Sequence, residues 1–148
     1  MKPLVEISNL VKYFDIGPRQ RVHAVDDVSF NIYPQEIVGL VGESGSGKST
    51  LGKTLLGLHN KTSGSIAFAG QTLPQRYASA DFRALAPKMQ MIFQDPYSSL
   101  NPRMTVGEIV GEGLRLQPNL SPNQVQQQVV HWLELVGLSA DHRSRYQI

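Results

Sequence analysis

The stretch that decides the fold is Val38-Gly-Leu-Val-Gly-Glu-Ser-Gly-Ser-Gly-Lys-Ser-Thr50. Residues 42–49 contain the pattern G-x-x-x-x-G-K-S, which is typical of a phosphate-binding loop. The apolar run at 37–41, rich in β-branched residues, predicts a buried strand before the loop. A helix is expected to follow from about 48 to 57. Strand, glycine-rich loop and helix start, in that order, form the context that this pattern requires.

The chemistry of such a loop follows from its backbone. Unpaired N–H groups of the loop and of the helix start point into one concavity, which attracts a polyphosphate. Lys48 would reach the β- and γ-phosphates, the Ser49 hydroxyl would bind Mg²⁺, and Thr50 would donate to the α-phosphate side. A glycine-rich turn that matches by chance is expected roughly once in a few hundred sequences of this length. The expected nucleotide-binding residues of the loop are Gly42, Glu43, Ser44, Gly45, Ser46, Gly47, Lys48, Ser49 and Thr50.

Composition sets the broad class. The 148 residues, 41% of them hydrophobic and 18% charged, suit one globular domain or most of one. The net charge of +2 comes from scattered positive residues, so no nucleic-acid footprint is expected. There are no cysteines, no apolar run as long as a membrane span, and no signal-peptide core at the N-terminus. The four histidines lack metal-ligand spacing and are expected to be ordinary surface or packing residues.

The first half of the chain predicts an antiparallel β layer ahead of an α/β core. Residues 4–14 and 22–33 are expected to form strands joined by a turn, since Gly and Pro lie between them. Beyond the loop helix, 64–70 predicts a short strand closed by glycines, 80–86 a helical turn, and 88–93 an apolar strand.

The second half predicts helices. Thr105-Val-Gly-Glu108 fits a capping box, and an apolar stripe follows it up to Leu114. Ser121 and Pro122 are expected to start another helix, whose apolar positions recur at helical spacing and include Trp132, interpreted as a packing residue. Gly137 is a plausible stop.

Four features together resemble the ATP-binding subunit of an ABC transporter. They are the aromatic at Phe14, the loop GESGSGKST at 42–50, the stretch FQDPYSSLNP at 93–102, and the helix end LELVGL at 133–138. The stretches GESGSGKS and FQDPYSSLNPR are most similar to those of importers of oligopeptides, dipeptides, glutathione or nickel. The resemblance implies a P-loop NTPase core of the ABC type over about 1–100, and the start of a helical subdomain over about 101–148.

The resemblance also implies roles and partners. Phe14 would stack on adenine, with Tyr13 as the neighbouring alternative, because stacking needs only a π-face. Gln94 would touch Mg²⁺ and the γ-phosphate side and link the site to the membrane subunits. Lys48 and Gln94 would then serve catalysis, and Ser49 and Gln94 the metal. The cofactors would be ATP and Mg²⁺. The partners would be transmembrane permease subunits and a second ABC ATP-binding domain, with no nucleic acid. The location would be cytoplasmic, peripheral on the inner face of the cell membrane.

The chain departs from the family in what it omits. A serine-glycine-glycine signature, an Asp-ended strand followed by a catalytic Glu, and a switch His are all missing from the sequence. These elements are expected beyond Ile148, so the chain is interpreted as the N-terminal portion of the domain. By this interpretation the 148 residues bind ATP without turning it over, although the parent domain is an ATPase. The strands expected at 37–41 and 89–93 would also lack their partners.

Two alternatives stay open at the level of sequence. One is another P-loop nucleotide-binding enzyme, such as a small-molecule kinase. The preceding antiparallel strands, the aromatic at Phe14 and the Gln94 loop argue against it. The other is a non-transport ABC ATPase acting on DNA or ribosomes, which the loop alone does not exclude but the stretch DPYSSLNP disfavours.

Overall fold

The computed structural model describes residues 1–95, 99–115, 117 and 119–146. The chain forms two compact units, Met1–Met91 and Ile92–Ile148, which we describe separately. The first contains the sheet and the glycine-rich loop, and the second is helical.

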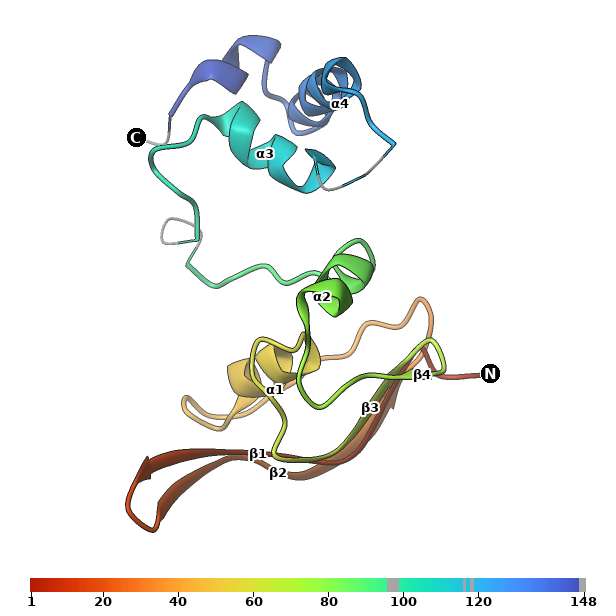
Figure 1. Ribbon diagram of the computed structural model, residues 1–148, viewed down its shortest axis with the longest axis vertical. Coiled ribbons are helices and arrows are strands. Elements are labelled where there is room, and N and C mark those ends of the chain that lie inside the picture. The colour runs from red at the N-terminus through yellow and green to blue at the C-terminus, as the bar shows by residue number, and fades with distance from the viewer. Residues whose placement is uncertain (96–98, 116, 118, 147–148) are drawn as a thin grey trace. The chain divides into compact units, whose positions relative to one another are not determined.

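The first unit is built on an antiparallel sheet of four strands, in the order β2-β1-β3-β4 (Figure 1). β1 (Val5–Gly17) and β2 (Gln20–Ile32) form a long hairpin. β3 (Ser63–Phe68) pairs with β1, and β4 (Gln71–Thr72) pairs with β3. The predicted antiparallel β layer is therefore confirmed, and so is the short strand after the loop helix.

Helix α1 (Lys48–Leu55) packs on this sheet and closes the core. Leu51 of this helix is buried in the core, and Leu55, one turn later, packs against it. A second short helix, α2 (Ser79–Leu85), ends just before Pro87, as the sequence predicts. The buried residues of this core are Val5, Ile7, Leu10, Val25, Leu51, Ile66 and Leu73.

Two predicted strands are absent from the described structure, and these predictions were wrong. Residues 37–41 form no strand, and Ile37 is 99% exposed. Residues 88–93 form none either, and Ile92 is 97% exposed. An extended segment becomes a strand only when a neighbour takes its N–H and C=O groups. Within the described residues no strand pairs with either segment.

The second unit is a small helical cluster. Helix α3 (Val106–Arg115) packs against α4 (Pro122–Leu135) and the 3₁₀ helix η1 (Ala140–Ser144). The predicted caps are confirmed: Ser121 Oγ accepts from the N–H of Gln124, whose side chain in turn accepts from the N–H of Ser121. The buried core residues are Leu114, Val125, Val129 and Leu133.

Trp132 departs from its predicted packing role. Its side chain is 52% exposed, while Leu133, the next residue, is 2% exposed. The apolar stripe along α4 is wider than the surface that α3 covers. Residues at the edge of this stripe, such as Trp132, therefore stay in contact with solvent. No helix in the described ranges is both long and apolar enough to cross a membrane.

Candidate functional site

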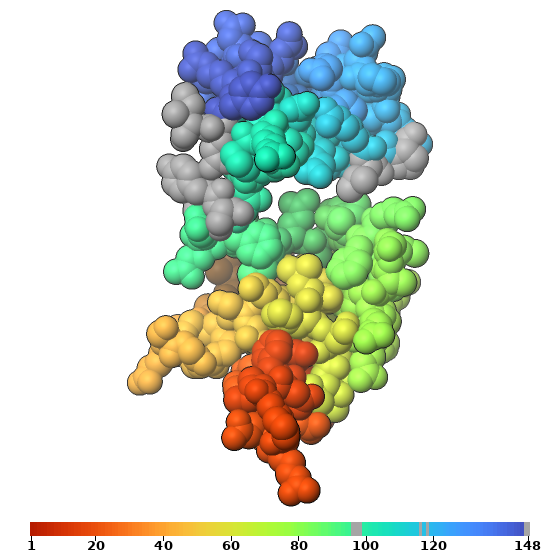
Figure 2. Space-filling view, turned by 60° about the vertical axis from the view of Figure 1, so that its left-hand side comes forward, coloured from red at the N-terminus to blue at the C-terminus, as the bar shows by residue number. Residues whose placement is uncertain are grey.

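The glycine-rich loop lies on the surface of the first unit and leads into α1 (Figure 2, light orange). Gly45 and Gly47 have φ angles of +82° and +91°, in the left-handed region that disfavours side chains. At Gly42 the space is also limited, because a Cβ there would lie 2.6 Å from the Ser46 hydroxyl. The path of the backbone thus requires Gly45 and Gly47, whereas at Gly42 the close neighbour is a side-chain hydroxyl.

The loop also rests on strand β2. A Cβ at Gly47 would collide with the carbonyl oxygen of Ala24, so the last glycine lets the start of α1 approach the strand closely. Sequence reasoning missed Ala24, since nothing in its own neighbourhood marks it as a contact of the loop.

Lys48 holds the loop from inside. Its ammonium donates to the carbonyl oxygens of Gly42 and Glu43, both at 2.6 Å, and lies 3.4 Å from Ser46 Oγ. The loop therefore concentrates one positive charge beside a helix start whose first N–H groups have no intrahelical acceptor. This combination suits an anion, and a polyphosphate in particular.

The residues also fit a nucleotide with its magnesium ion. Ser49 is exposed in the first turn of α1 and offers a hydroxyl oxygen, the kind of hard ligand that Mg²⁺ takes alongside phosphate oxygens. No group of three or more His, Cys, Asp or Glu side chains suited to a metal exists among the described residues. A magnesium ion here would rely on the phosphates and on few protein ligands, as is usual for this metal.

Phe14 lies on the side of the sheet that faces the core and α1. Lys12 pairs with the buried Val25 across the hairpin, and alternation along β1 places Phe14 on the same side as Lys12. The Lys12 ammonium is 4.5 Å from the centroid of the Phe14 ring, and the His59 ring meets that ring edge-on at 5.2 Å. Sequence reasoning treated His59 as an ordinary histidine and missed this contact.

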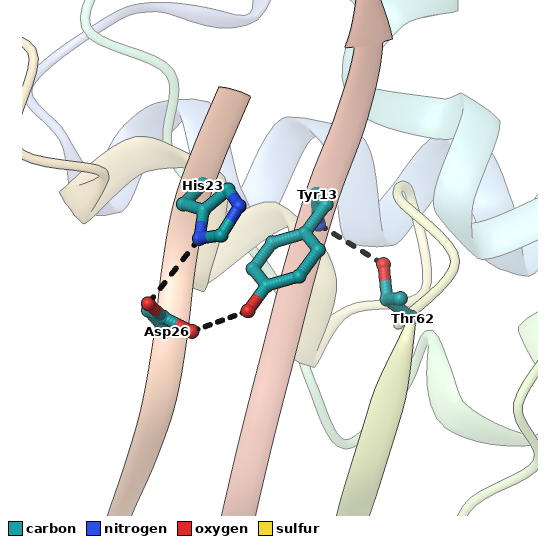
Figure 3. Close-up of polar contacts among 4 residues, drawn as sticks. All are labelled: Tyr13, His23, Asp26 and Thr62. Atoms are coloured by element: carbon teal, nitrogen blue, oxygen red, sulfur yellow. Dashed lines mark hydrogen bonds and ion pairs between the residues drawn. The ribbon is translucent and has the colours of Figure 1, made fainter. Parts of the chain in front are cut away.

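Tyr13, the alternative to Phe14, belongs to the other side of the sheet (Figure 3). Its ring stacks on His23 with centroids 3.8 Å apart, and its hydroxyl donates to Asp26 at 2.5 Å. This hydrogen bond raises the pKa of Tyr13 and lowers that of Asp26. The backbone N–H of Tyr13 donates to Thr62 Oγ1. Both aromatic rings therefore have contacts of their own, and the side of the sheet, which Phe14 shares with α1, is what favours Phe14.

Gln94 is exposed and lies at the start of the second unit. Its proximity to the loop around Lys48 stays a prediction. Ser99 Oγ donates to the carbonyl oxygen of Asp95 at 2.5 Å. Residues 96–98 of this loop lie outside the described residues.

Known proteins place the chain in a family. Residues 25–147 match the family model described as "ABC transporter". The chain is 47% identical over 144 residues to the oligopeptide transport ATP-binding protein OppF of Bacillus subtilis (strain 168), covering 97% of this chain and 47% of that protein. It is 41% identical over 151 residues to the glutathione import ATP-binding protein GsiA of Pectobacterium atrosepticum, covering 98% and 24%. The chain therefore spans about half, or less, of the length of these curated relatives.

Solved structures agree on the fold. The ATP-binding cassette MJ0796 bound to ADP and Pi matches with a TM-score of 0.82 at 23% identity, over 96% of this chain and 61% of that one. The structure of cbiO1 from Clostridium perfringens matches with a TM-score of 0.73 at 24% identity, over 97% and 53%. The predicted ABC-type ATPase fold is thereby confirmed. Since the family model covers most of the sequence, this chain belongs to the ABC transporter family.

Proposed function

We propose that the chain is the ATP-binding part of an ABC importer that couples ATP binding and hydrolysis to the uptake of peptides or a similar small solute. The observation that carries this proposal is the geometry of the loop at 42–50. The Lys48 ammonium donates to the carbonyl oxygens of Gly42 and Glu43 directly beside the first turn of α1. The peptide and glutathione import functions named for the relatives support the choice of solute class.

Each residue of the loop has a role in this proposal. Lys48 would leave part of its contact with the loop carbonyls to meet the β- and γ-phosphates, and the backbone N–H groups of the loop would hold the phosphate oxygens. Ser49 would bind the magnesium ion and Thr50 the α-phosphate side. The bound ion would neutralise charge that develops during phosphoryl transfer, which depends mostly on positioning and electrostatics.

Residues outside the loop complete the proposed site. Phe14 would stack on the adenine, because it lies on the side of the sheet that faces α1, whereas Tyr13 lies on the other side. Gln94 would contact the magnesium ion and the γ-phosphate side, and would report nucleotide state to the permease. The working assembly would contain transmembrane permease subunits and a second ATP-binding domain, on the cytoplasmic face of the membrane.

Equilibrium binding of Mg-ATP tests the proposal. Lys48→Ala removes the charge that meets the phosphates and should reduce affinity at least about tenfold, since a hydrogen bond to a charged group is worth about 1.5–3 kcal/mol. Lys88→Ala is the matched control, because it removes the same charge from an exposed position outside the loop. Equal affinities of the wild type and Lys48→Ala would refute the assignment.

A further inference from the structure

His59 lies between two parts of the proposed nucleotide site: it follows helix α1, and its side chain contacts Phe14 on strand β1. The N–H groups of Leu58 and His59 both donate to the carbonyl oxygen of Lys53, at 2.9 and 3.2 Å. His59 is thereby fastened to the last turn of α1, the helix whose first turn carries Lys48 and Ser49.

The side chain of His59 reaches from this anchor to strand β1. Its ring and the Phe14 ring are 5.2 Å apart between centroids, with an angle of 87° between their planes. Edge-to-face packing of this kind is a preferred arrangement of aromatic rings. The Lys12 ammonium, 4.5 Å from the centroid, provides a second contact for the Phe14 ring. The ring is therefore held from two sides, by its own strand and by the segment that follows α1.

We propose that His59 is a positioning residue for the nucleotide base: it fixes the orientation of the Phe14 ring relative to α1. The inference rests on the proposed function, in which Phe14 is the stacking platform for adenine. Because the Phe14 ring contacts the residue that follows α1, its position is fixed relative to Lys48 and Ser49 at the start of that helix. The adenine site and the phosphate site then keep a constant distance and orientation. Without this contact, the Phe14 ring would become ordered only when the nucleotide binds. The entropy lost in ordering the side chain would reduce the affinity for the nucleotide.

The charge state of His59 fits this role. Burial lowers the pKa of His59, and the nearby charges of Lys12 on β1 and Lys53 on α1 lower it further. The imidazole is therefore neutral at physiological pH, and it packs as an uncharged ring. Protonation would place a third positive charge beside Lys12 and Lys53, and repulsion from these two lysines would move the His59 ring away from its position against Phe14. Ordering of the base platform should thus decline only as the pH falls through the lowered pKa of His59, which lies below its ordinary value of 6.5.

The test separates base binding from phosphate binding. We would measure the affinities of Mg-ATP and of Mg-tripolyphosphate, which lacks the base, and take their ratio. Phe14→Ala should lower this ratio on the order of tenfold, the usual scale for loss of one base stack. His59→Ala should lower it about two- to fivefold and leave tripolyphosphate affinity unchanged. His59→Phe should restore most of the ratio, and His131→Ala, an exposed histidine on α4, is the control.

The outcomes are distinguishable. If His59→Ala keeps the wild-type ratio while Phe14→Ala lowers it, the positioning role is refuted and the proposed function stands. Loss of tripolyphosphate affinity in both His59 variants would also refute it, because the residue would then only support the fold. If Phe14→Ala itself leaves the ratio unchanged, the base platform fails. The wild-type ratio should fall as the pH is lowered from about 8 through the lowered pKa of His59, while that of His59→Phe does not, and parallel profiles would overturn the proposal.

Discussion

Gly47 lies directly against the carbonyl oxygen of Ala24, and this contact seats the start of α1 on strand β2. Gly47 also has a φ of +91°, where a side chain is strained whatever the available space. The glycine thus serves the fold as well as the phosphate chemistry, because no other residue could adopt this backbone conformation so close to the strand.

The first prediction concerns this contact. Gly47→Ala should destabilise the protein by about 1–3 kcal/mol through backbone strain alone, because the residue is held in an unfavourable backbone region. Displacing the Ala24 carbonyl oxygen should add to this loss. Gly52→Ala is the matched control: a Cβ there meets nothing within 4 Å, and alanine in a helix interior is favoured over glycine by up to about 1 kcal/mol. Chemical unfolding measures both. Equal stability of Gly47→Ala and the wild type would contradict the contact.

Much of the fold could be predicted because its signals are local. The hairpin of β1 and β2 follows from two extended apolar runs around a Gly-Pro turn, and the caps at Thr105 and Ser121 follow from polar residues at fixed offsets. The loop pattern predicted the start of α1 near Lys48. Each of these features needs only a few consecutive residues to specify it.

The errors and omissions arise where distant parts of the chain decide the structure. Residues 37–41 have the composition of a strand, yet composition does not tell whether a neighbour takes their backbone groups. Trp132 lies in an apolar stripe, but how much of the stripe is covered depends on α3. The contacts of Ala24 with Gly47 and of His59 with Phe14 join residues remote in sequence, and no spacing rule indicates them.

The second prediction concerns the capping box of α3 and its pH dependence. The Glu108 carboxylate accepts from the N–H of Thr105 at 2.8 Å and from its hydroxyl at 3.0 Å, and these bonds lower the pKa of Glu108. Because the folded-state pKa is lowered, this stabilisation is fully present above the unfolded pKa, about 4.5, and is lost as the pH falls through the folded pKa.

Amide hydrogen exchange measures this effect. Protection at the start of α3 should decrease in acid in the wild type, while Glu108→Gln should show a weaker dependence on pH. Glu112→Gln, one turn later on the same helix and outside the cap, should behave like the wild type. Identical profiles for Glu108→Gln and the wild type would show that the carboxylate does not stabilise the helix start.

The third prediction concerns Gln94 and rests on the proposed function. In the full-length protein, assembled with its membrane subunits, Gln94→Ala should reduce transport-linked ATP turnover more than it reduces ATP binding. The residue is exposed and is expected to act on the γ-phosphate side rather than to supply most of the binding energy. Gln126→Ala, an exposed glutamine on α4, is the control. Normal transport and turnover in Gln94→Ala would exclude the coupling role.

The last prediction concerns the polypeptide of residues 1–148 itself. Ile37 and Val41 are 99% and 95% exposed, and Ile92 is 97% exposed, so two apolar segments that pair with no strand in the described part of the chain face solvent. Such segments invite edge-to-edge association and contribute no burial to stability. The sequence also lacks the Asp-Glu strand end that would polarise the attacking water in this family.

We therefore expect this polypeptide to be marginally stable, to self-associate, and to release no phosphate from Mg-ATP above background. Phosphate release and thermal unfolding of the purified polypeptide, followed across a range of concentrations, measure all three properties. Replacing Ile37 and Val41 together by serine should reduce self-association without lowering the unfolding midpoint, because neither side chain is buried in the first unit. A cooperative transition with sustained turnover, lost in Lys48→Ala, would mean that the catalytic groups lie within these residues after all.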